Sequence, residues 1–274
     1  MTLVVFDLDG TLLNRDSKIS PYTAETLEKM RQKNILYTVA TGRTLQAAAS
    51  PLRNHCFILP MILKNGAIIW CPRKKGYSHH HLLSGSEVWP VLSAFNANDL
   101  TPFVFSLDNL QDHVLYHGSL KSTNEQKLAQ LFEDERSLPL EPLSEMPEEM
   151  GVINVFSVGC ESAIKQVRKN ITQKQNLVSY SGVAIENQNL HWIDIHHSLG
   201  SKGNAIKQLR SELNVQHVVV FGDGDNDITM FQSANESYAP ANADPAIINL
   251  ADQVIGHHDE DGVAHFLRQR FDLF

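Results

Sequence analysis

Two short apolar segments, far apart in the chain, each run directly into acidic residues. Residues 3–6 are followed by Asp7-Leu8-Asp9-Gly10, and residues 218–221 are followed by an acidic run at residues 222–227. Short apolar, β-branched runs are typical of strands buried in a parallel sheet. Since ligands bind beyond the carboxyl ends of such strands, we expect both acidic runs at one edge of one sheet. The first and last parts of the chain are therefore expected to fold together.

Strand and helix patterns alternate in both of these parts. The first part contains strand patterns at 3–6, 35–40 and from 61, and helix patterns after Ser20-Pro21 and at 44–54. The last part contains helix patterns at 201–213, from 244 and around 263–271, and strand patterns at 218–221 and 254–255. This order predicts an α/β fold with a doubly wound, Rossmann-like parallel sheet.

The middle of the chain has a different pattern. Strand-like runs at 103–105 and 114–116 flank a polar turn, as in an antiparallel hairpin, and further helices and strands follow. We therefore predict an α+β insertion between the two halves of the sheet. The predicted core consists of residues 1–81 and 189–274, and the predicted cap, or specificity domain, of residues 82–188.

Composition excludes several classes of protein. The 274-residue chain carries a formal charge of −8, which argues against non-specific nucleic-acid binding. Its longest apolar stretch, residues 57–63, is far shorter than the roughly 20 residues of a membrane helix. The three cysteines are widely spaced, which suits a reducing compartment. We expect a cytoplasmic protein that binds neither nucleic acid nor membrane.

The acidic runs have two interpretations. Taken alone, Asp7-Leu8-Asp9-Gly10 is most simply a polar turn. Together, the two runs would gather four or five carboxylates, which is unfavourable unless a cation lies among them. Oxygen ligands without His or Cys favour Mg²⁺. The sequence therefore predicts a magnesium site.

Two further polar segments supply groups that bind phosphate. Thr41-Gly42-Arg43 follows the strand at 35–40, and Ser201-Lys202-Gly203 begins a helix. A hydroxyl, backbone N–H groups, an ammonium and a helix N-terminus all bind phosphate oxygens. With a carboxylate nucleophile and a metal, they indicate phosphoryl transfer through an aspartyl phosphate.

With these segments, the sequence resembles the haloacid dehalogenase-like (HAD) phosphohydrolases, specifically the Cof-type phosphatases with a large inserted α/β cap. The matching segments occur in the family's order and span the chain outside the insertion: Asp7-Leu8-Asp9-Gly10-Thr11-Leu12, Ala40-Thr41-Gly42-Arg43, Lys64-Asn65-Gly66-Ala67, Ser201-Lys202-Gly203, Gly222-Asp223-Gly224-Asp225-Asn226-Asp227 and Asp261-Gly262-Val263-Ala264.

The resemblance implies a role for each matching residue. Asp7 would be the nucleophile, and Asp9 the general acid and base whose backbone carbonyl also ligates Mg²⁺. Asp223 would ligate the metal directly and Asp227 would support it. The implied phosphate- and substrate-binding set is Leu8, Thr41, Gly42, Arg43, Asn65, Lys202 and Asn226. In many relatives the loop around Asn242 also faces the site, but the glycine common before that asparagine is missing here.

The resemblance leaves alternative functions open. An acid at Asp9 favours hydrolysis, whereas the ion-pumping relatives carry Thr there. Sugar phosphomutases keep the acid too, so a mutase or phosphotransferase remains an alternative to a phosphatase. A third reading is a non-catalytic metabolite-binding module. We expect a phosphoric monoester hydrolase acting on small phosphorylated metabolites, either sugar phosphates or phosphorylated cofactor precursors, as a monomer or weak homodimer. A lid-like cap would close over the leaving group.

Two histidine-rich segments are expected to have no role in the chemistry. His79-His80-His81 is interpreted as a solvated loop, because neighbouring side chains on an extended chain point to opposite faces. His196-His197 lies near the return from the insertion to the core, where contact with substrate is an alternative, and is interpreted as a surface pair.

Overall fold

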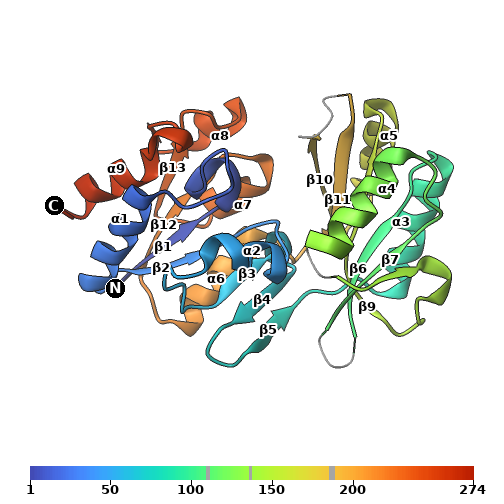
Figure 1. Cartoon of the computed structure of the whole chain (residues 1–274), viewed down its shortest axis with the longest axis horizontal. Coiled ribbons are helices and arrows are strands. Elements are labelled where there is room, and N and C mark those ends of the chain that lie inside the picture. Colours follow the sequence, from blue (N-terminus) through green and yellow to red (C-terminus); the bar gives the residue numbers. More distant parts are fainter. Residues whose placement is uncertain (109–111, 136–137, 185–188) are drawn as a thin grey trace. The chain divides into compact units, whose positions relative to one another are not determined.

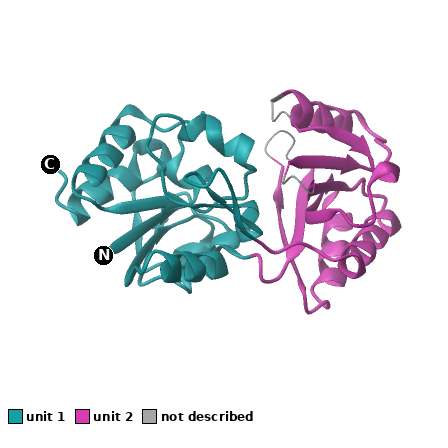
Figure 2. Cartoon of the chain, turned by 90° about the horizontal axis from the view of Figure 1, so that it is seen from below, with its two compact units in different colours: residues 1–79, 201–274 teal, residues 80–200 magenta. Residues whose placement is uncertain are grey.

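A computed structural model describes residues 1–108, 112–135, 138–184 and 189–274. The chain divides into two compact units, shown in different colours in Figure 2. The first unit combines Met1–His79 with Ser201–Phe274, and the second is His80–Gly200. Both ends of the chain therefore contribute to one unit, with the intervening segment forming the other.

The first unit is built on a five-stranded parallel sheet in the order β14-β13-β12-β1-β2. Figure 1 labels β13, β12, β1 and β2 of this sheet. Its strands are β1 (Thr2–Phe6), β2 (Leu36–Val39), β12 (His217–Phe221), β13 (Glu236–Pro240) and β14 (Gln253–Ile255). In this sheet β1 pairs with both β2 and β12, which places Phe6 beside Val39 and Phe221. The ends of β1 and β12, one near each end of the chain, are thus adjacent.

Helices cover both faces of this sheet. They are α1 (Pro21–Gln32), α2 (Leu45–Leu52), α6 (Lys202–Glu212), α7 (Ile228–Phe231), α8 (Pro245–Leu250) and α9 (Gly262–Arg270). Leu3 and Val5 pack into a core with Ile206 and Leu209 of α6. Because side chains alternate along a strand, Val4 points to the opposite face of the sheet. The helices α1 and α9 pack against one another. The predicted α/β fold with a doubly wound sheet is confirmed.

A small second sheet differs from the expected arrangement. β3 (Met61–Leu63) is joined to the five-stranded sheet by an isolated parallel β-bridge between Ala40 and Ile62. It then pairs antiparallel with β4 (Ile68–Cys71) in a three-stranded sheet, which β5 (Gly76–His80) completes. His79 and His80 therefore lie in a strand, and His79 contacts Glu212 at 3.3 Å, so the prediction of a loop was wrong for these two residues, whereas His81 follows the strand. The local polar composition concealed this edge strand.

The second unit is a six-stranded sheet, antiparallel except for one pair, in the order β10-β11-β9-β6-β7-β8. Its strands are β6 (Phe103–Leu107), β7 (His113–His117), β8 (Leu140–Pro142), β9 (Gly151–Gly159), β10 (Leu177–Val183) and β11 (His191–His197). The helices α3 (Gly85–Ala97) and α5 (Glu161–Ile171) pack against this sheet through Phe95 and Val167. A further helix, α4 (Thr123–Gln130), leads into a turn at Leu131–Glu135.

The limits predicted for the insertion stay a prediction. Gln188, the predicted last residue, lies outside the described residues, as does the turn of the predicted hairpin at residues 109–111. The strand β11, which follows Gln188, pairs with β9 and β10 of the second sheet. In that strand His196 is fully buried, so reading it as a surface residue was wrong. Among the described residues, no helix is both long and apolar enough to span a membrane.

Candidate active site

Asp7 and Lys202 form a buried ion pair at the carboxyl end of β1. The Asp7 N–H donates to the Phe221 carbonyl at 2.9 Å, which continues the β1–β12 ladder and fixes the residue at the sheet edge. The Lys202 Nζ donates to Asp7 Oδ1 at 2.6 Å. The lysine is completely buried and Asp7 is only 6% exposed. Two residues 195 positions apart in sequence thus meet at one point.

The same lysine binds a second carboxylate. Its Nζ donates to Asp227 Oδ1 at 2.6 Å. The other oxygen of Asp227 accepts the backbone N–H groups of Asp223 at 2.9 Å and Gly224 at 3.1 Å. The chain turns after β12, and in this turn the N–H groups of Asp223 and Gly224 are bonded by the Asp227 side chain instead of by a backbone carbonyl. Both oxygens of Asp227 are thus engaged by protein donors.

Asp223 faces the turn that follows β1. Its Oδ1 accepts a hydrogen bond from the Thr11 hydroxyl at 3.0 Å. Gly10 adopts a φ of +72°, and a Cβ there would lie 2.3 Å from Asp223 Oδ2. Only glycine permits this close approach of the turn to the carboxylate. Thr11 was not among the predicted site residues, although it belongs to the quoted segment after Asp7.

The polar residues after β2 and β3 form a second side of the site. The Asn65 N–H donates to the Thr41 carbonyl at 2.9 Å. Asn226 Nδ2 donates to Asn65 Oδ1 at 2.9 Å. Gly42 lies against Asn65, whose Oδ1 would be 3.1 Å from a Cβ at that position. The structure therefore brings Thr41, Gly42, Asn65 and Asn226 together, as expected of a phosphate-binding set.

Asp9 and Arg43 form a separate pair near this group. Arg43 donates from Nε to Asp9 Oδ2 and from Nη2 to Asp9 Oδ1, at 2.8 and 2.5 Å. The Asp9 side chain is 56% exposed, in contrast to Asp7. Its carboxylate is not part of the close group formed by Asp7, Asp223 and Asp227. Leu8, between the two acids, is fully buried.

The buried charges do not balance. Burial raises the pKa of Asp7 well above its usual range; Lys202 opposes this, while the neighbouring carboxylates add to it. Burial likewise raises the pKa of Asp223 to about 6. For Lys202, burial lowers the pKa, but Asp227 and Asp7 outweigh that effect and raise it. With all three carboxylates ionised, the single ammonium of Lys202 would leave this group with a net charge of −2, which is why the pKa values of Asp7 and Asp223 rise.

The donor set of this cluster fits a hard divalent cation. Oxygen atoms of Asp7, Asp223 and Asp227 lie within 4.8 Å of one another. Carboxylate oxygens without nitrogen or sulfur donors are typical of Mg²⁺ sites. A divalent ion would also supply the two positive charges that the cluster lacks. Both Asp227 oxygens already accept hydrogen bonds, so Asp7 and Asp223 are better placed to bind the ion directly.

Comparison with known proteins identifies the family. The sequence pattern of the haloacid dehalogenase-like hydrolases matches residues 4–267. The chain belongs to this family. A 5-amino-6-(5-phospho-D-ribitylamino)uracil phosphatase of Bacillus subtilis is 23% identical to this HAD hydrolase, over 99% of its chain and 98% of the relative.

Solved structures show the same fold. A haloacid dehalogenase-like hydrolase from B. subtilis has a TM-score of 0.81 and 23% identity, and covers 98% of this HAD hydrolase and 99% of its own chain. A HAD subclass IIB sugar phosphatase has a TM-score of 0.79 and 22% identity, and covers both chains completely. The predicted resemblance to the Cof-type HAD hydrolases is confirmed, and so is the predicted class of phosphoric monoester hydrolase.

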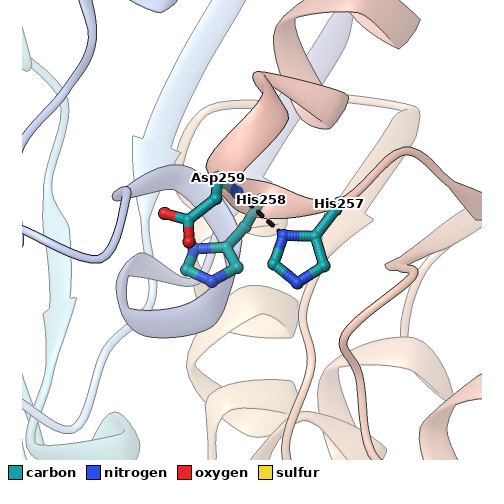
Figure 3. A group of neighbouring side chains, drawn as sticks. All are labelled: His257, His258 and Asp259. Carbon is teal, nitrogen blue, oxygen red and sulfur yellow. Dashed lines mark hydrogen bonds between the residues drawn. The ribbon is translucent and has the colours of Figure 1, made fainter.

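One group in this HAD hydrolase was not singled out from the sequence. His257, His258 and Asp259 lie together at the turn before α9 (Figure 3). Each already has a protein partner: His257 Nδ1 accepts the Asp259 N–H at 3.2 Å, His258 bonds the Leu13 carbonyl at 2.7 Å, and Asp259 pairs with Arg15 at 2.8 Å. These contacts attach the turn to the segment after Asp9.

Proposed function

We propose that this HAD hydrolase is a Mg²⁺-dependent phosphatase of small phosphorylated metabolites that works through an aspartyl phosphate at Asp7. The observation that carries the proposal is the Lys202 ammonium, which is buried and 2.6 Å from both Asp7 and Asp227. A nucleophilic carboxylate held by a fixed cation at a strand end is suited to attack on phosphorus. The relatives named as phosphatases support the same activity.

The first chemical step would transfer the phosphoryl group to the enzyme. A carboxylate oxygen of Asp7 forms a bond to phosphorus while the bond from phosphorus to the ester oxygen breaks. Asp9 gives its proton to that leaving oxygen, so an alcohol departs. Thr41, the Gly42 N–H and Lys202 would bind the charged oxygens of the transferring group.

The second step would release phosphate. Asp9, now a carboxylate, accepts a proton from water as the water oxygen bonds to phosphorus. The bond between phosphorus and the Asp7 oxygen breaks, which regenerates the free Asp7 carboxylate and inorganic phosphate. Asp7, Asp223 and the Asp9 carbonyl would hold Mg²⁺, with Asp227 in support. When bound, the ion supplies positive charge that offsets the charge of the phosphoryl oxygens.

The substrate class rests on the insertion and on the relatives. A unit of its own between the two sheet halves is large enough to supply contacts to the part of a substrate that varies. We propose that the core sets the chemistry and the insertion sets the specificity. The relatives include a phosphatase of a phosphorylated ribitylamino pyrimidine and a sugar phosphatase. Sugar phosphates and phosphorylated cofactor precursors are therefore the substrates to test first.

Phosphate release from a panel of such esters, with Mg²⁺ and after chelation, tests the proposal. We expect turnover of some small esters that disappears without a divalent ion. A phosphotransferase or mutase would instead move the phosphoryl group to an added alcohol or isomerise a bisphosphorylated sugar. Absence of turnover across the panel with Mg²⁺ would favour the non-catalytic alternative.

A further inference from the structure

The turn that carries Asp9 is bound by two side chains from the last quarter of the chain. Asn242 Nδ2 donates to the Gly10 carbonyl at 2.8 Å. The Nδ1 of His258 lies 2.7 Å from the Leu13 carbonyl. A carbonyl only accepts, so His258 carries its proton on Nδ1 and donates. Both bonded carbonyls follow Asp9, one directly and one at the end of the turn.

Asn242 and His258 also bind one another. The His258 N–H donates to Asn242 Oδ1 at 3.1 Å. The asparagine therefore uses its amide nitrogen on the turn and its oxygen on the histidine backbone. The two residues form one continuous link between Gly10 and Leu13. The ion pair of Asp259 with Arg15 extends this link just beyond the turn.

The turn that carries Asp9 is closed by the Leu12 N–H, which donates to the Asp7 carbonyl at 3.3 Å, and by the Leu13 N–H, which donates to the Leu8 carbonyl at 2.9 Å. The bonds from Asn242 and His258 engage two further carbonyls, both of which follow Asp9. Asp9 and Gly10 depart from helical geometry within the turn Leu8–Leu12. The Asp9 side chain is 56% exposed and is held by Arg43, so packing does not fix it as it fixes Asp7. Arg43 therefore orients the Asp9 carboxylate, while the backbone of the turn sets where the Asp9 Cα lies. A general acid must reach the oxygen it protonates within hydrogen-bond distance, so small backbone shifts matter.

We propose that Asn242 and His258 are positioning residues that hold Asp9 where its carboxyl reaches the leaving oxygen. The inference rests on the proposed acid–base role of Asp9. It adds two residues that act through the Gly10 and Leu13 carbonyls and touch no reacting atom. It also gives a purpose to Asn242, whose neighbourhood departs from the family pattern at the residue before it.

Leaving-group dependence distinguishes positioning from simple structural support. p-Nitrophenolate is a weak base and departs without a proton, whereas the alkoxide of a sugar phosphate needs one. Misplacing Asp9 should therefore reduce kcat/KM for the alkyl ester and largely spare the aryl ester. Kcat/KM reports the steps up to transfer to Asp7, so the shared hydrolysis of the aspartyl phosphate does not obscure the difference.

The decisive comparison is His258→Leu against His258→Asn. Asparagine places an N–H donor at the same δ position as the histidine Nδ1, whereas leucine has none. We expect His258→Leu to lower kcat/KM for the best sugar phosphate of the panel about 10- to 100-fold. The value for p-nitrophenyl phosphate should change less than about 3-fold. His258→Asn should restore most of the loss.

Three further variants complete the experiment. His257→Ala is the matched control, because the His257 side chain bonds the Asp259 N–H rather than a carbonyl of the turn, and the variant should leave both esters unchanged. Asn242→Asp, which keeps the oxygen but loses the donor to Gly10, replaces His258→Leu if that variant does not fold. Asp9→Asn should show the same selective loss more strongly.

The possible failures can be told apart. Suppose first that Asp9→Asn shows its selective defect. The positioning role is then overturned if His258→Leu lowers kcat/KM equally for both esters or for neither. It is also overturned if His258→Leu and His258→Asn behave identically. If Asp9→Asn itself fails to discriminate the two esters, the acid–base assignment falls, and the inference falls with it.

Discussion

The Arg43 guanidinium holds both oxygens of the Asp9 carboxylate, with its Nε 2.8 Å from Oδ2 and its Nη2 2.5 Å from Oδ1. Arg43 is further fixed by donating from Nη1 to the Ala47 carbonyl at 3.1 Å. The proposed acid and base is therefore held by a side chain that we also expect to contact substrate. Two parallel N–H donors define the orientation of a carboxylate, which a single ammonium does not.

Arg43→Lys keeps the charge but loses this geometry. We expect kcat/KM to fall about 10-fold or more, because Asp9 loses its orientation. The free energy of unfolding should change by less than about 1 kcal/mol, since exposed ion pairs contribute little. Steady-state kinetics and chemical denaturation of the same variant measure both quantities. Unchanged kinetics would remove Arg43 from the proposed site.

Asp7→Asn should abolish turnover and leave the fold intact. The amide keeps the shape of the carboxylate but lacks the nucleophilic oxygen, so no aspartyl phosphate can form. Phosphate release and a circular dichroism spectrum test the two halves of this statement. If activity stays within a few-fold of the natural protein, the nucleophile is a different residue.

Lys202→Met should destabilise the protein by about 3 to 5 kcal/mol, because it leaves buried carboxylates without their counter-ion. Lys202 is fully buried and bonds both Asp7 and Asp227, so no solvent can replace it. Unfolding experiments in the presence of a chelator measure the loss. Added Mg²⁺ should recover part of the stability through binding to the same carboxylates. A variant as stable as the natural protein under chelation would contradict the charge imbalance described above.

Asp223→Asn tests the pH dependence of the metal-free protein. The carboxyl has an ordinary pKa of 3.8 and a folded-state pKa of about 6, so the folded protein binds more protons between these values. Stability from this group is therefore fully present below pH 4 and is lost as the pH rises through about 6. The loss amounts to roughly 3 kcal/mol for about two pKa units.

Asp223→Asn should not show this loss of stability as the pH rises. Asparagine mimics the neutral carboxyl, so without metal it should be more stable than the natural protein at pH 7 and similar to it at pH 4. With Mg²⁺ the order should reverse, because the variant binds the ion weakly. Melting temperatures across this pH range, with chelator and with Mg²⁺, provide the measurement. Parallel curves for the two proteins would show that Asp223 is already ionised in the metal-free state.

Local patterns indicated four strands of the parallel sheet, but β13 (Glu236–Pro240), which lies between β12 and β14, was missed. The apolar runs that form β1 and β12 are unbroken, and Ser20 and Thr44 begin α1 and α2 by accepting N–H groups three residues on. Such signals depend only on neighbouring residues. The contact of Lys202 with Asp7 spans 195 positions, and family resemblance rather than local pattern indicated it.

One buried histidine was misread from the sequence and another histidine was overlooked. His196 reads as polar surface, yet it is fully buried and lies 3.7 Å from Asp194 two positions earlier on the same face of β11. His258 gives no local signal at all, because its role follows from a carbonyl at residue 13. Burial of a polar side chain is decided by what packs over it, and a single sequence does not contain that information in readable form.

The strand order has a consequence for synthesis of the chain on the ribosome. β1 is made first, and one of its two neighbours, β12, lies more than 200 residues later. Until that strand emerges, one edge of β1 has no partner, and Asp7 has no lysine beside it. Unpaired apolar edges are prone to aggregate, so fragments that end before residue 221 should be poorly soluble. The pair of Asp7 with Lys202 and the proposed metal site can thus be complete only in chains whose synthesis has passed the second acidic run.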